Sequence, residues 1–148
     1  MKGPTAGAAA LLLCLATAGS ALGATWDVKM LNHGSDGRMM VFEPAFVKVA
    51  PGDTVRFLPV DKGHNVALIP GMAPAGAPSF KGDLSQEVDV RFEKKGVYGY
   101  ECVPHAGLGM VGVIEVGAPT NKAQALAAAD QLVGDGKRRM LELLALAR

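Results

Sequence analysis

The sequence contains few cysteines, histidines and aromatic residues. Its 148 residues include two cysteines, three histidines and only 5% Phe, Trp and Tyr. One cysteine, Cys14, lies in an apolar N-terminal segment, so a chain without that segment retains only Cys102 and cannot form an internal disulfide. Basic residues are not in excess, because 15 Lys and Arg stand against 14 Asp and Glu. We therefore expect no nucleic-acid partner, since such a partner requires a basic surface.

The N-terminal segment has the layout of a secretory signal peptide. Lys2 gives it a positive start, residues 8–18 are apolar, and small residues precede a cleavage point after Gly23, with cleavage after Ala24 as the alternative. The apolar run is too short to span a bilayer, and no later segment is apolar enough for a membrane helix. We expect residues 1–23 to be cleaved and residues 24–148 to form one exported domain.

Short segments separated by turn residues fill the chain from Thr25 to Val116. Apolar and polar residues alternate in several of them, and Pro51–Gly52 fits the centre of a type II turn. Residues 70–83 are rich in Pro and Gly and predict a long surface loop. This spacing favours an all-β sandwich. The expected strands are residues 26–31, 46–50, 54–60, 64–69, 87–92, 97–102 and 111–116.

The composition changes after Pro119. Residues 121–133 and 137–148 are rich in alanine and leucine, and a Gly-Asp-Gly sequence lies between them. This pattern predicts a tail of two helices from about residue 120. Each helix has an apolar side that can pack on the sandwich.

One expected loop contains an unusual set of side chains. Cys102, His105 and Met110 offer a thiolate, an imidazole and a thioether within nine residues, and glycines and a proline bend the chain between them. Two histidines and a cysteine in a plane, with a distant axial methionine, form the blue-copper pattern. The second histidine is expected to be His64, at the start of a strand, whereas His33 is interpreted as a solvated turn residue.

Other interpretations of these residues account for fewer of them. Zinc accepts cysteine and histidine but does not normally use methionine. A Cys–His hydrolase leaves Met110 and His64 without roles. A multicopper enzyme needs further histidines, and only one remains after two are used. We therefore expect a single-copper carrier and no enzyme, with a copper-binding or delivery protein without redox turnover as the alternative.

Two long segments resemble a known family. The sequences MVFEPAFVKVAPGDTVRFLPVDKGHNV and YECVPHAGLGMVGVIEVG, followed by two helices, are similar to the cupredoxins and, among them, to the pseudoazurin family. The resemblance implies a Greek-key β-sandwich with two C-terminal α-helices and one type 1 copper bound by His64, Cys102, His105 and Met110. It also implies a periplasmic, monomeric one-electron carrier that delivers electrons to denitrification enzymes, chiefly nitrite reductase.

The resemblance assigns roles to residues beside the ligands. In cupredoxins, an asparagine at the position of Asn65 bonds to the ligand loop and ties it to the strand. Basic residues around the copper edge serve partner docking in this family, and Lys62 and Lys81 match that pattern. The apolar residues around His105 would form the remaining docking surface: Pro104, Ala106 and Leu108.

The chain departs from the family pattern at several positions around the loop. Val103 stands in place of the usual hydroxyl residue, Ala106 in place of an aromatic residue, and Leu108 in place of a common methionine. Glu101 and His33 replace expected basic residues. These changes leave the ligand set intact and concern docking and tuning of the site.

Overall fold

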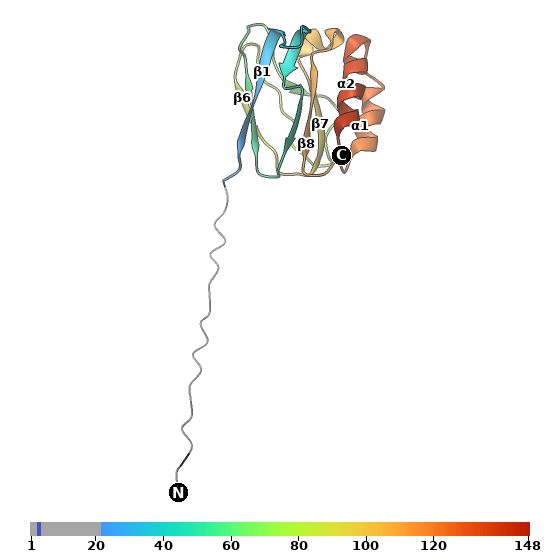
Figure 1. The fold of residues 1–148 in the computed structure, drawn as a ribbon. Coiled ribbons are helices and arrows are strands. Elements are labelled where there is room, and N and C mark those ends of the chain that lie inside the picture. The colour runs from blue at the N-terminus through green and yellow to red at the C-terminus, as the bar shows by residue number, and fades with distance from the viewer. Residues whose placement is uncertain (1–2, 4–21) are drawn as a thin grey trace.

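Two four-stranded β-sheets face each other in the computed structural model (Figure 1). The structure describes residue 3 and residues 22–148, so nearly all of the expected signal peptide lies outside the described residues. The first sheet has the order β2 (Met39–Glu43), β1 (Thr25–His33), β4 (Thr54–Leu58) and β6 (Val88–Arg91). The second has the order β3 (Phe46–Val49), β8 (Val111–Val116), β7 (Gly96–Glu101) and β5 (Ala67–Leu68).

The strand pairing is mixed. β1 runs parallel to β4, with Val28 opposite Phe57, and β3 runs parallel to β8. The remaining pairs are antiparallel, including β7 with β8, where Tyr98 lies opposite Ile114. Because parallel neighbours cannot be joined by a short hairpin, the chain passes between the two sheets as it winds.

Apolar side chains from both sheets form the main core. Phe42, Phe57 and Tyr100 meet edge to face, with ring centroids 4.8–6.2 Å apart. Cys102 and Met110 belong to the same buried cluster, so the predicted ligand loop begins and ends in the core. Among the described residues, the buried members of both core clusters lie between Val28 and Ala147, so both clusters belong to the domain that is expected after removal of the leader.

Two helices form a third layer on the outer face of β7 and β8. These are α1 (Lys122–Ala129) and α2 (Gly134–Leu146), and Figure 1 shows both on the same side of the sandwich. They bury a second apolar cluster that includes Val97, Val113, Met140 and Leu144. β7 and β8 are thus covered on both faces, which explains their nearly uninterrupted apolar sequences. Within the described residues, neither helix has the length and apolar character of a membrane span.

The predicted architecture is confirmed, with local differences. The turn at Pro51–Gly52 forms as expected, since Gly52 has a φ of 96° and the amide of Asp53 donates to the carbonyl of Ala50. β2 was not among the expected strands, and the expected strand 64–69 is ordered as a strand only at Ala67–Leu68. The 70–83 loop is not wholly superficial, because Met72 is fully buried beneath the helices.

Candidate metal centre

The loop between β7 and β8 is closed by its own backbone hydrogen bonds. A 3₁₀ turn, η1 (Val103–Leu108), begins after Cys102, and Gly109 ends it with a φ of 97° that a residue with a side chain rarely adopts. The amide of Cys102 donates to the carbonyl of Met110 at 2.9 Å, and the amide of Met110 donates to the carbonyl of His105 at 3.2 Å. The loop therefore holds the backbones of Cys102, His105 and Met110 together.

His64 reaches this loop from the segment just before β5. Its Nδ1 atom lies 3.1 Å from His105 Nδ1 and 3.8 Å from Cys102 Sγ. The Cys102 Sγ atom lies 3.4 Å from His105 Nδ1. Two nitrogens that share one ion at about 2 Å each can be no more than about 4 Å apart, and the observed separation meets that limit. His64, Cys102 and His105 can therefore form a copper site.

The three side chains differ in their access to water, and this affects their protonation. His64 and Cys102 are almost inaccessible to solvent, and His105 is partly exposed. Burial raises the pKa of the Cys102 thiol and, together with His105, lowers the pKa of His64. A metal ion that binds here therefore displaces a thiol proton, while His64 is already neutral and able to ligate. Met110 is fully buried at the end of the same loop and offers the thioether that copper accepts.

Asn65 joins the His64 segment to the ligand loop. Its Oδ1 accepts a hydrogen bond from the amide of Val103 at 2.9 Å, and its Nδ2 donates to the carbonyl of Gly82 at 3.2 Å. The Asn65 side chain is buried, and its bond to Gly82 is shielded from water, whereas its bond with Val103 is only partly buried. The bond to Val103 is the contact with the ligand loop that the resemblance implied for Asn65.

Sequence analysis did not identify Asn32, which contacts the other side of His64. His64 Nε2 lies 2.8 Å from Asn32 Oδ1. Because an amide oxygen only accepts, Nε2 carries the hydrogen and Nδ1 presents its lone pair to the site. The backbone N–H of Asn32 donates to the Asp61 carboxylate at 2.7 Å. No sequence signal marked Asn32, because it lies 32 residues before His64 and the two side chains meet only in the folded chain.

The start of α2 packs tightly against the ligand loop. A Cβ atom on Gly136 would overlap the carbonyl oxygen of Ala106, and one on Gly134 would lie 2.7 Å from the carbonyl oxygen of Gly107. Only residues without side chains permit this approach of helix and loop. The helical tail therefore supports the outer side of the loop, at the end of the molecule where Figure 1 shows η1.

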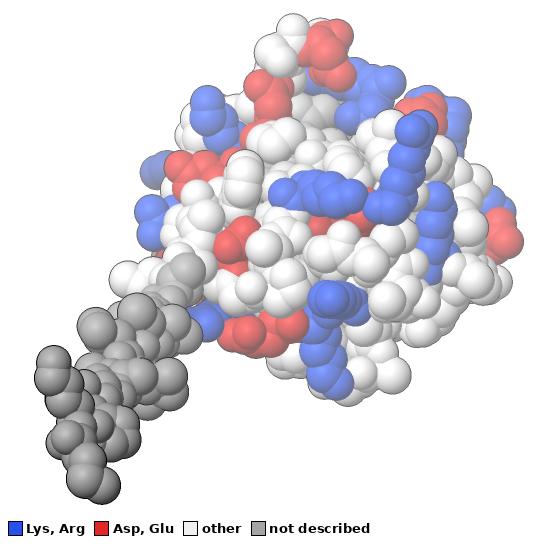
Figure 2. Space-filling view, turned by 60° about the horizontal axis from the view of Figure 1, so that its bottom comes forward, with Lys and Arg blue, Asp and Glu red and all other residues white. Residues whose placement is uncertain are grey.

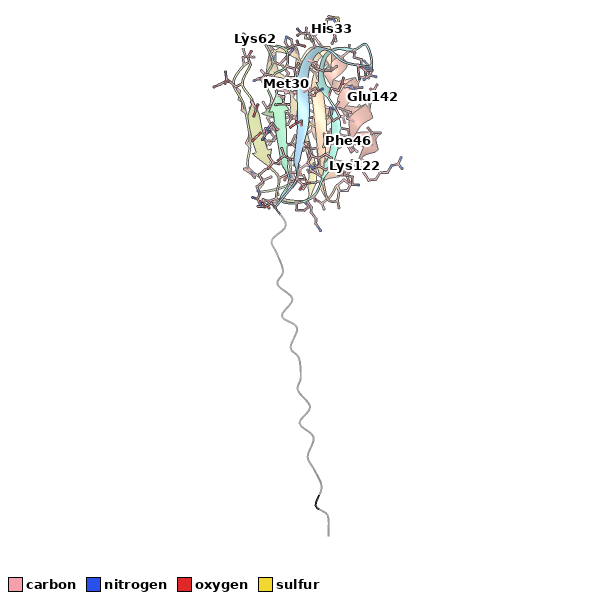
Figure 3. The ribbon with its side chains drawn as sticks, turned by 60° about the vertical axis from the view of Figure 1, so that its left-hand side comes forward. Met30, His33, Phe46, Lys62, Lys122 and Glu142 are labelled. Carbon is pink, nitrogen blue, oxygen red and sulfur yellow. The ribbon has the colours of Figure 1, made fainter. Side chains whose placement is uncertain are left out.

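The predicted docking residues lie around the same end. Lys62 and Lys81 are exposed, and Figure 3 places Lys62 at the end where His33 also lies. Leu108 and Pro104 are exposed as well, whereas Ala106 is half-buried against α2. Lys81 lines a shallow surface pocket together with Asn65, Val103 and Pro104, which places it beside the ligand loop.

Comparison with known proteins gives the family. Residues 28–117 match the sequence model for copper binding proteins of the plastocyanin/azurin family. Pseudoazurin from Methylorubrum extorquens is 49% identical over 118 residues, covering 80% of this chain and 79% of the relative. Pseudoazurin from Paracoccus pantotrophus is 50% identical over 117 residues, covering 78% and 79%. The crystal structure of native pseudoazurin from Hyphomicrobium denitrificans has 39% identity and a TM-score of 0.77, and covers 84% of this chain and 99% of its own.

The chain belongs to the plastocyanin/azurin family of copper-binding proteins. Within that class it is related over most of its length to the pseudoazurins, and about half of the aligned residues are identical. Pseudoazurins are cupredoxin electron carriers and not enzymes, so this relationship indicates a type 1 copper electron carrier that works with redox partners. The predicted family, fold and cofactor are confirmed.

Proposed function

We propose that the chain carries single electrons in the periplasm on one copper ion bound by His64, Cys102, His105 and Met110, and that it donates them to a nitrite reductase. The observation that supports this most directly is the convergence of His64 Nδ1, Cys102 Sγ and His105 Nδ1 within 4.8 Å of one another. Copper, when bound, supplies a one-electron couple between Cu(I) and Cu(II).

The protein holds this donor set rigid through contacts on three sides. Asn32 fixes the ring of His64, Asn65 ties the His64 segment to the loop, and Gly136 lets α2 support the loop from outside. A carrier needs such support, because a site that keeps its geometry in both redox states reorganises little during transfer. The burial of His64 and Cys102 argues against a delivery protein, because such a protein must release its metal readily.

The electron would leave through the exposed side of His105. This side chain is partly accessible, while Cys102 is buried completely. Next to it lie exposed apolar side chains, including Leu108 at 61% and Val103 at 49% exposure. An apolar rim allows close contact with a partner, and Lys62 and Lys81 would orient an acidic partner from a distance. The half-buried Glu101 lines a surface pocket with Ala106 and Gly107, where its carboxylate would weaken that attraction, and burial raises the pKa of this group.

The periplasmic location follows from the predicted leader. Residues 1–23 combine a basic start, an apolar run and a small residue at the cleavage point. The single thiol of residues 24–148, Cys102, is buried in the site, which would protect it from oxidative pairing in an oxidising compartment.

Two measurements test the proposal. Purified protein with Cu(II) should show an intense thiolate-to-copper visible band and the EPR spectrum of a type 1 site. In stopped-flow transfer to a copper nitrite reductase, Leu108→Asp should slow the second-order rate at every salt concentration. Replacing Lys62 and Lys81 by Glu should slow the rate several-fold at low salt only, because salt screens exposed charges.

Lys95→Glu is the matched control for these charge changes. Lys95 is exposed just before β7, at the end of that strand opposite the ligand loop. Its reversal changes the net charge by the same amount as the reversal of Lys62 or of Lys81 alone, without changing the rim. If Lys95→Glu slows transfer as much as either single reversal, Lys62→Glu or Lys81→Glu, then the rim lysines have no specific docking role. If Leu108→Asp leaves the rate unchanged, the apolar rim is not the docking face.

A further inference from the structure

Asp53 is a buried carboxylate at the end of the sandwich opposite the metal centre. It follows the Pro51–Gly52 turn and has 7% of its surface exposed. Its Oδ2 accepts hydrogen bonds from Trp26 Nε1 at 3.0 Å and from the amide of Ala50 at 2.9 Å. Its Oδ1 accepts one from the amide of Ala24 at 2.8 Å. These hydrogen bonds hold the pKa of Asp53 below its usual value and keep the group ionised. The bond from the amide of Ala50 has the largest effect, followed by the bond from Trp26.

Within residues 22–148, no lysine or arginine forms an ion pair with Asp53. The charged side chains nearby, Arg91 and Glu93, pair with each other instead. Figure 2, in which this end of the molecule comes forward, shows Lys and Arg side chains lying among Asp and Glu. Buried charges in proteins are usually paired with an opposite charge. A buried carboxylate with only neutral donors therefore suggests that a positive charge forms beside it at a later stage.

The donor on Oδ1 is the nitrogen at the predicted cleavage point. Ala24 is the first residue after Gly23, and its carbonyl accepts a hydrogen bond from the amide of Thr54 at 2.8 Å. Both backbone groups of Ala24 are thus held at the start of β1. We propose that Asp53 is the binding site for the α-ammonium group that removal of the leader before Ala24 creates. This inference rests on the export leader of the proposed function and not on electron transfer.

Hydrolysis by a processing peptidase accounts for the charge. Water adds its hydroxyl to the carbonyl carbon of Gly23, the bond from that carbon to the nitrogen of Ala24 breaks, and the nitrogen takes up protons. The products are a carboxylate on the leader and an ammonium on Ala24. An amide with one N–H thereby becomes a cation with three, whose ordinary pKa is about 7.7–8.0. The contact with Asp53 then becomes a charge-assisted hydrogen bond.

This ion pair distinguishes a correctly processed chain from other forms. A chain that keeps its leader presents only a neutral amide to Asp53. A chain that begins at Thr25 has lost the nitrogen that lies 2.8 Å from Asp53 Oδ1. Cleavage at one particular bond therefore adds stability to the start of β1, which lies next to β4 in the first sheet.

A four-member cycle tests the proposal. Residues 24–148, which contain both core clusters of the described residues, are prepared with a free or an acetylated Ala24 nitrogen, each with Asp53 or with Asp53→Asn. Acetylation should lower the Tm by about 2–8 °C when Asp53 is present and change it little in Asp53→Asn. If acetylation has the same effect in both backgrounds, or none in either, Asp53 does not bind the ammonium and only stabilises the turn.

Two further measurements do not depend on the folding of the Asp53 variant. In the unmodified chain, the α-ammonium pKa measured by NMR should lie above its ordinary range, and a value within or below that range overturns the proposal. Mass spectrometry of the exported protein should find Ala24 as the first residue. A different first residue overturns the proposal. None of these measurements uses the redox activity, so their failure would not contradict the proposed electron transfer.

Discussion

Replacement of Asn65 by alanine should weaken the fold and the metal centre together. The amide side chain bridges the amide of Val103 and the carbonyl of Gly82. Alanine removes both hydrogen bonds and leaves a donor and an acceptor without a protein partner. A buried polar group without a partner costs about 1–3 kcal/mol. Because Val103 lies partly at the surface, its amide can recover a bond to water, and the expected total loss is about 2–4 kcal/mol.

Urea denaturation of the copper-free protein measures this loss directly. The free energy of unfolding should fall by that amount, with an unchanged slope against urea concentration. In the copper-loaded variant, the visible band should shift and copper should dissociate faster into a chelator, since the ligand loop is no longer tied to the His64 segment.

Asn121 offers a matched control. Its amide forms two hydrogen bonds to the backbone of Val97, at 2.7 and 3.0 Å, where β7 begins. Asn121→Ala should therefore lower stability by a similar amount while the copper spectrum stays as in the unmodified protein. The reasoning is refuted if Asn65→Ala retains the original spectrum and copper dissociation rate, or if its stability falls by less than about 0.5 kcal/mol.

Three other changes test the ligand set and its support. Cys102→Ser should abolish the intense visible band, because that absorption requires a copper–thiolate bond; a protein that keeps its colour excludes a blue-copper site. Met110→Gln should keep copper but lower the reduction potential in cyclic voltammetry, since an oxygen ligand favours Cu(II) over Cu(I), and a raised potential would argue against an axial Met110. Gly136→Ala should destabilise the protein in thermal unfolding even though alanine is the better helix former by about 1 kcal/mol, because its Cβ overlaps the carbonyl of Ala106. Gly107→Ala, with open space around its Cβ, should change the Tm little, and equal effects of the two substitutions would contradict the tight contact.

The sequence determined the local parts of this protein. The order and spacing of Cys102, His105 and Met110, with the glycines between them, indicated a bent ligand loop because each of these signals acts over a few residues. The Pro51–Gly52 turn and the two alanine- and leucine-rich helices were predicted for the same reason. The alternating strands indicated a sandwich, since a period of two residues requires one buried face. Those patterns did not show that helices cover the outer face of β7 and β8.

Tertiary structure alone decided which distant residues meet. His64 reaches Cys102 across 38 residues, and Asn32 reaches His64 across 32. Asp53 accepts a hydrogen bond from the amide of Ala24 across 29 residues, and the local sequence around neither residue indicates this contact. These contacts depend on the parallel pairing of β1 with β4 and on the packing of one sheet on the other. Such pairings bring together segments whose local sequences contain no information about each other, so only the folded chain shows how the ligands are held and where the new N-terminus would bind.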